Sequence, residues 1–147
     1  MDEAQKALWD AVYMPTDEEN EEASQIMRDL PNSYGGTLEA LMKWRGFASD
    51  EDFANEIRYN TRTVWRMRKE EEYVTTLKTA VKVCVGLQLP LILCMDVIIK
   101  SSASRKLTPK TVKLFNVLPA MCCLHLKLDE LDEFLTYKGL GDLDSDN

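Results

Sequence analysis

The sequence contains little histidine and no clustered cysteine. Its 147 residues include 1 His and 4 Cys, and the cysteines stand in apolar runs without a CxxC pair. Zinc sites and disulfide frameworks both need ligands or cysteine pairs at regular spacing. Cys122 and Cys123 are adjacent, which disfavours a disulfide between them. We therefore predict buried thiols in a reducing cytoplasm, with no metal and no other cofactor.

The chain also lacks a long apolar run and a glycine-rich phosphate loop. The most apolar stretch, residues 83–99, is interrupted by Gln88, Pro90 and Asp96. It falls short of the roughly 20 apolar residues that cross a bilayer. The first ten residues do not have the basic and then apolar layout of a signal peptide. His125 has no carboxylate at helical spacing toward a serine or a thiolate. These absences argue against a membrane protein and against an enzyme, and they favour a cytoplasmic binding protein.

Acidic charge gathers at the two ends of the chain, and the net charge at pH 7 is −7. Residues 1–35 carry nine acidic and two basic residues, and residues 126–147 carry seven acidic and two basic ones. Residues 36–99 balance to zero, and residues 100–125 hold five basic residues and no acidic one. Because charge acts on phosphate only over about a Debye length, the acidic total does not exclude nucleic acid as a partner.

Apolar residues recur at helical spacing along the chain, and no segment alternates as a half-buried strand does. We therefore predict an all-α protein. Residues 1–36 are expected to form an acidic helical extension that ends at the turn PNSYGG, residues 37–103 the central domain, and residues 104–147 a C-terminal helical extension with a frayed acidic tail. Helix caps are expected at the following residues: Thr16 or Asp17, Ser49, Asn60, Thr75 or Thr76, and Thr108.

Two apolar sets are predicted to be buried. The central domain should share one core made of Phe53, Ala54, Ile57, Val64, Met67, Leu77, Val81 and Leu87. The last helix, near residues 126–137, should bury Leu128, Leu131, Phe134 and Leu135, either on the domain or against a second copy.

One central segment has the layout of a helix-turn-helix. Two short helices, residues 49–57 and 61–69, are separated by only three residues, which is the turn length of that motif. Asn60 can cap the second helix with its side-chain oxygen. Residues 58–69 hold five basic residues and no acidic one. Such a helix can enter a major groove, where arginine recognises guanine and threonine contacts a thymine methyl.

This pattern resembles the Cro/repressor-type (XRE) family of helix-turn-helix transcriptional regulators. The matching residues are Phe53-Ala54, Asn60 and Arg62-Thr63-Val64-Trp65-Arg66-Met67. Residues 77–89 and the helix from Pro90 resemble the two helices that close the five-helix domain of that family. Residues 114–135 and the ending DEFLTYKG are similar to a C-terminal extension of some bacterial members.

The resemblance implies a five-helix lambda-repressor-like domain over residues 37–103 that binds double-stranded DNA as a homodimer. Arg62 and Arg66 are expected in the groove, Thr61 and Thr63 at the helix entry, and Arg68 and Lys69 nearer the phosphate backbone. The full set of expected DNA contacts is Asn60, Thr61, Arg62, Thr63, Trp65, Arg66, Arg68 and Lys69.

Two positions depart from the family pattern. Arg58 stands in the turn where the family usually has glycine, and the first motif helix opens with three acidic residues, 50–52, where a neutral donor is common. Acid at that place repels the DNA backbone. The acidic N-terminal third and an outward-facing Trp65 favour a second interpretation, a protein-interaction module on the same scaffold with weak or lost DNA binding. Both interpretations stay open at this point.

Overall fold

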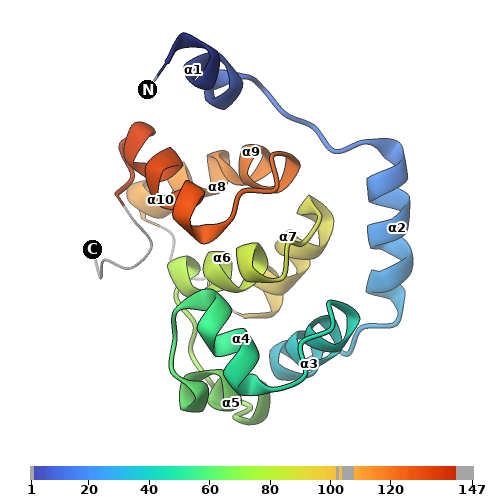
Figure 1. Ribbon diagram of the computed structural model, residues 1–147. Helices are drawn as coiled ribbons and strands as arrows, with labels where there is room; N and C mark the ends of the chain where they lie inside the picture. Colours follow the sequence, from blue (N-terminus) through green and yellow to red (C-terminus); the bar gives the residue numbers. More distant parts are fainter. Residues whose placement is uncertain (1, 102, 104–107, 142–147) are drawn as a thin grey trace.

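The computed structural model describes residues 2–101, 103 and 108–141, and all regular structure within them is helical (Figure 1). The helices are α1 (Glu3–Asp10), α2 (Asp17–Arg28), α3 (Tyr34–Trp44), α4 (Asp50–Ile57), α5 (Thr61–Lys69), α6 (Leu77–Gly86), α7 (Leu91–Lys100), α8 (Pro109–Asn116), α9 (Leu118–Cys123) and α10 (Leu128–Tyr137). The all-α prediction is confirmed. The predicted frayed tail beyond Gly141 lies outside the described residues.

The helix starts follow from side-chain capping. A capping oxygen accepts a hydrogen bond from the backbone N–H three residues later and so satisfies a donor that the helix leaves unpaired. The structure has such bonds at Thr16, Ser49, Asn60, Thr76 and Thr108. These positions confirm the predicted caps and resolve the two pairs of alternatives in favour of Thr16 and Thr76.

Helix α3 begins inside the PNSYGG turn, at Tyr34, rather than after it. The Ser33 side chain caps it by accepting from the N–H of Gly36 at 3.1 Å. A Cβ atom on Gly35 would lie 2.2 Å from the backbone oxygen of Arg68. The glycine is therefore required because α3 approaches the end of α5 closely, and not because the chain turns there.

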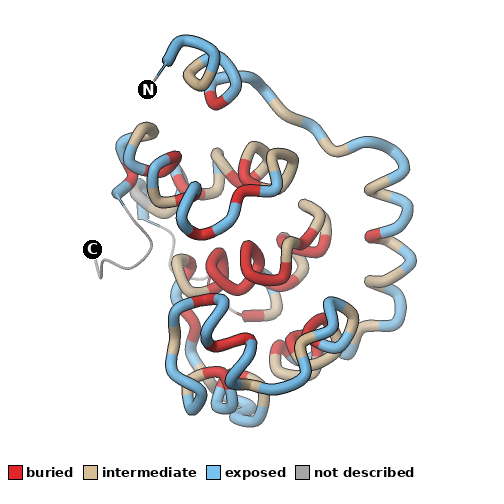
Figure 2. The backbone as a smooth tube through the Cα atoms, viewed as in Figure 1, coloured by how far each residue is buried: buried red, intermediate tan, exposed pale blue. Residues whose placement is uncertain are grey.

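Helices α3 to α7 share one core around α6. Burial is nearly continuous along α6 and is confined to the inner faces of its neighbours (Figure 2). All eight residues predicted for this core are buried and belong to one cluster. A Cβ on Gly86 would lie 2.3 Å from Cγ2 of Ile57, so the absence of a side chain at residue 86 lets α6 pack closely on α4.

The two extensions cover different sides of this unit. Helix α2 packs along α7, and α9 and α10 contact α7 and α6 respectively. Helix α10 buries its predicted apolar set, Leu128, Leu131, Phe134 and Leu135. Helix α1 lies apart from α2 across an extended link and sits beside α10 (Figure 1), where the Trp9 ring meets Phe134 edge-on with centroids 5.4 Å apart. Within the described residues, no helix has both the length and the apolar character needed to span a bilayer.

Candidate nucleic-acid interface

Helices α4 and α5 pack against each other and are joined by three residues, 58–60. Phe53 and Ile57 of α4 and Val64 and Met67 of α5 are fully buried between them and their neighbours. The pair therefore holds the outer face of α5 at a defined angle to the rest of the chain.

The turn between the helices contains a left-handed residue. Arg58 has φ 62° and ψ 39°, a conformation that costs a non-glycine residue about 1 kcal/mol. Its side chain forms ion pairs with two carboxylates of α10, Asp132 at 2.8 Å and Asp129, which offset part of this cost. The next residue anchors the turn, because the Tyr59 hydroxyl and Thr79 Oγ1 of α6 are hydrogen-bonded at 2.7 Å.

The N-terminus of α5 is closed by Asn60. Its Oδ1 accepts from the N–H of Thr63 and from the Thr63 hydroxyl, both at 2.8 Å. This double acceptance leaves Thr63 half-buried and engaged, whereas Thr61 and Arg62 are exposed. Of the two predicted threonines at the helix entry, only Thr61 is therefore open to a partner.

The exposed face of α5 forms a continuous ridge. Its members are Thr61, Arg62, Trp65, Arg66 and Lys69, which recur at intervals of three and four residues and so share one side of the helix. Trp65 lies at the middle of the ridge and is 45% exposed, as predicted from its position after buried Val64. We call this set the α5 ridge.

Arg66 of the α5 ridge is already paired within the chain. Its Nε donates to Glu70 Oε1 at 2.9 Å, and its guanidinium lies 5.3 Å from the ring centre of Tyr73. The hydrogen bond from Arg66 is the main cause that lowers the pKa of the Glu70 carboxyl below its ordinary value. Both side chains are more than a third exposed, and water screens such ion pairs so that they contribute little to stability. A stronger acceptor could therefore replace Glu70.

Arg68 follows Arg66 by two residues and so points from another side of α5, toward α3 and α4. Its Nε and Nη2 donate to the two Asp50 carboxylate oxygens at 2.6 and 2.8 Å, and Nη1 donates to Glu39 at 3.1 Å. The Arg68 side chain is only 15% exposed. The geometry thus assigns Arg68 to an internal network that joins α5 to α4 and α3, away from the α5 ridge, where the sequence had suggested a phosphate contact.

This network also accounts for one of the acidic residues at the start of α4. Asp50 is neutralised by Arg68, while Glu51 and Asp52 stay exposed. The negative charge at the start of α4 that would face a DNA backbone is therefore smaller by one. Sequence reasoning missed the network because the Asp50 and Glu39 partners lie 18 and 29 residues from Arg68.

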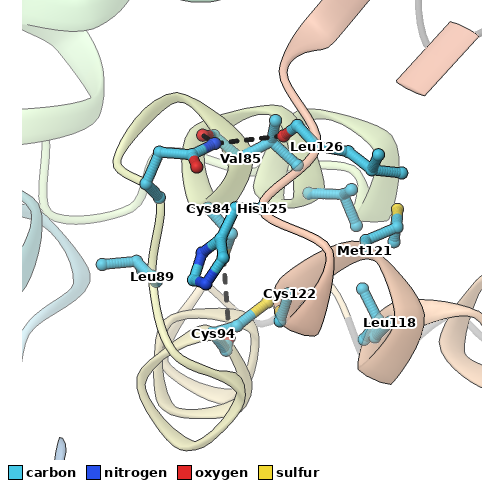
Figure 3. Close-up of a pocket in the computed structure, with 11 residues that line it drawn as sticks. Cys84, Val85, Leu89, Cys94, Leu118, Met121, Cys122, His125 and Leu126 are labelled. Atoms are coloured by element: carbon cyan, nitrogen blue, oxygen red, sulfur yellow. Dashed lines mark hydrogen bonds between the residues drawn. The ribbon is translucent and has the colours of Figure 1, made fainter. Parts of the chain in front are cut away.

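A second region of chemical interest lies under α9, where three cysteines line a pocket with His125 (Figure 3). The cavity measures only about 10 Å³, about the space of a single water molecule. Cys84 Sγ donates to the Cys94 carbonyl at 3.7 Å, and a hydrogen bond with Cys94, together with burial, raises the pKa of the Cys122 thiol. No group in the described residues has the donors to hold a metal ion. The raised pKa values of Cys94 and Cys122 disfavour their thiolate forms, and the thiols of this pocket pack the core.

No protein-family model matches the chain, and no curated protein or solved structure is significantly similar to it. Function is therefore inferred from the residues and their geometry.

Proposed function

We propose that this protein is a DNA-binding transcriptional regulator that places the α5 ridge in the major groove of double-stranded DNA. The observation that carries the proposal is the α5 ridge itself, an exposed basic face on a helix that is capped by Asn60 and fixed by a short turn to α4. The resemblance to the Cro/repressor-type family supports the same interpretation. The protein is then a cytoplasmic binding protein of bacterial type without catalytic activity.

Four of the five ridge residues have distinct roles in this proposal. Arg62 and Arg66 lie one helical turn apart, and each guanidinium can donate two hydrogen bonds to the O6 and N7 atoms of a guanine. Arg66 exchanges its exposed partner Glu70 for the base. Thr61 stands at the helix entry beside the backbone or a thymine methyl, and Lys69 neutralises a phosphate at the far end.

The small size of the reading surface supports a homodimer as the DNA-binding form. A single short helix contacts only a few base pairs, so proteins of this design pair two copies on half-sites about one DNA turn apart. We expect enriched DNA sequences to contain two related half-sites at that spacing. An enriched single half-site would instead indicate that one copy binds alone.

The test is selection of binding sequences from a random duplex library with the full chain. Arg62→Ala or Arg66→Ala should cost about 1–3 kcal/mol against the preferred base and relax the selected sequence. Lys69→Ala should weaken all sequences equally and reduce the salt dependence by about one phosphate contact. Arg28→Ala, which removes an exposed charge from α2, is the matched control and should change neither property. Equal effects of all four variants would contradict the proposal.

Trp65 supports a second candidate function, that of a protein-interaction module on the same scaffold. A large aromatic residue that is 45% exposed at the centre of a polar ridge is typical of a protein-binding hot spot. Two results together would favour this alternative. The chain would show no salt-dependent retention on heparin or duplex DNA, and Trp65→Ala would abolish binding of a protein partner. The Asp52→Asn variant, which reduces the acid on α4, should then also fail to bind DNA.

A further inference from the structure

The turn before α5 is tied to the C-terminal helix by one arginine. Arg58 Nη1 donates to Asp132 Oδ2 at 2.8 Å, and its Nη2 pairs with the Asp129 carboxylate. Glycine would occupy this left-handed position without strain. An arginine there can offset the strain through its side chain, which reaches across to α10. We call these three residues the turn latch.

The two carboxylates present the arginine with the same chemistry as a phosphate group. Asp129 and Asp132 are three residues apart and so lie on one face of α10. Together they accept from Nη1 and Nη2 of one guanidinium, and the same two nitrogens can donate to the oxygens of a phosphate. Arg58 stands two residues before the N-cap Asn60, beside a helix N-terminus that itself favours an anion.

Helix α10 is firmly held, whereas the latch contact is open to solvent. Buried Leu131 and Phe134 fix α10 on the protein, and from the other side Tyr137 donates to Asp10 of α1 at 2.7 Å. In the latch, the Asp129 side chain is 96% exposed, whereas the side chains of Arg58 and Asp132 are 33% and 29% exposed. Arg58 can therefore leave the carboxylates by side-chain rotation, without any movement of α10.

We propose that the turn latch is an autoinhibitory contact, in which Asp129 and Asp132 occupy an arginine that would otherwise bind a DNA phosphate. The inference rests on the proposed function, and it describes how DNA binding at that same site is regulated. Arg58 is a phosphate-binding residue in this scheme, and it comes in addition to the α5 ridge. Each binding event must displace two carboxylates, so the latch lowers affinity for every DNA sequence to the same extent.

The experiment measures binding of the full chain to mixed-sequence duplex DNA across a salt series, where phosphate contacts dominate. Asp129→Asn with Asp132→Asn should raise affinity about tenfold at low salt and steepen the salt dependence by about one contact. Glu130→Gln with Glu133→Gln changes the charge of the same helix equally, on exposed residues outside the latch. This control should raise affinity by only about twofold, because screened charge acts weakly at a distance. Asp129→Asn alone, on a fully exposed side chain, should give an intermediate gain and leaves folding intact.

Arg58→Ala in the double-asparagine background distinguishes an arginine released from these two carboxylates from a general loss of repulsion between acid and DNA. The proposal requires this triple variant to fall back to wild-type affinity. It is overturned if the triple variant keeps the gain, or if the glutamine control matches the asparagine variant. Wild-type binding that depends on Arg62 and Arg66 but does not respond to the asparagine changes overturns the latch alone. Absence of salt-sensitive binding in every variant overturns the proposed function together with the latch.

Discussion

The inner and outer faces of α5 carry the same residue type in two opposite environments. Arg68, on the inner face, donates to two carboxylates of other helices and is 15% exposed. Arg66, two residues earlier on the outer face, has one exposed partner, Glu70, which lies just beyond the end of its own helix. The difference is that the Arg68 partners are fixed by the fold, whereas Arg66 can change its partner at little cost. A basic helix is therefore not a uniform binding surface, and only its outer face is available to a ligand.

The largest expected effect comes from removing the inner arginine. Arg68→Ala leaves Asp50 nearly buried and without its partner, and a loss of this kind destabilises a protein by about 2–3 kcal/mol when the site is partly hydrated. We expect this shift in the free energy of unfolding by urea denaturation. Arg62→Ala, on the outer face, should stay within about 0.5 kcal/mol of wild type.

Replacing the whole inner pair sharpens the same contrast. Arg68→Met with Asp50→Leu removes both charges and keeps apolar volume, so most of the stability should return. If the double variant is as unstable as Arg68→Ala, then Arg68 contributes through its own packing rather than by neutralising Asp50.

An effect of intermediate size is expected at the turn. Arg58→Ala loses the α10 ion pairs and keeps the left-handed strain, whereas Arg58→Gly loses the pairs and relieves the strain. We therefore expect the glycine variant to be more stable than the alanine variant by about 1 kcal/mol. Thermal unfolding of the two variants measures the difference. Equal stabilities would mean that the backbone at residue 58 is not held in the left-handed region.

Local features of the fold could be predicted from the sequence because they depend on residues close together in the chain. The caps at Ser49 and Asn60 bond to N–H groups three residues away. The burial of Val64 and Met67 follows from helical periodicity alone. The exposure of Trp65 follows in the same way, so the α5 ridge was predicted almost entirely.

Contacts between distant segments could not be predicted. The partners of Arg58 lie 71 and 74 residues away, and those of Arg68 lie on two other helices. In both cases the sequence identifies the arginine. It does not tell whether a distant carboxylate of the same chain forms an ion pair with that arginine. The sequence likewise indicates a turn at Gly35, whereas the structure has a close approach between two helices there. Glycine is typical of both situations, so its presence alone does not distinguish them.

The smallest expected effect concerns Glu70, which partly occupies the outer face. The hydrogen bond from Arg66 lowers the pKa of the Glu70 carboxyl, so the charged form is stabilised in the folded state. This contribution is present above the ordinary glutamate pKa and is lost as the pH falls through the lowered value. Glu70→Gln should therefore flatten the acid side of the stability curve slightly and leave the stability at neutral pH almost unchanged, because water screens this exposed pair. Because the same change frees Arg66, affinity for duplex DNA should rise severalfold at low salt, and Glu72→Gln provides the matched charge control. If both glutamine variants gain equally, Glu70 acts only through its charge, and the Arg66 pair does not compete with DNA.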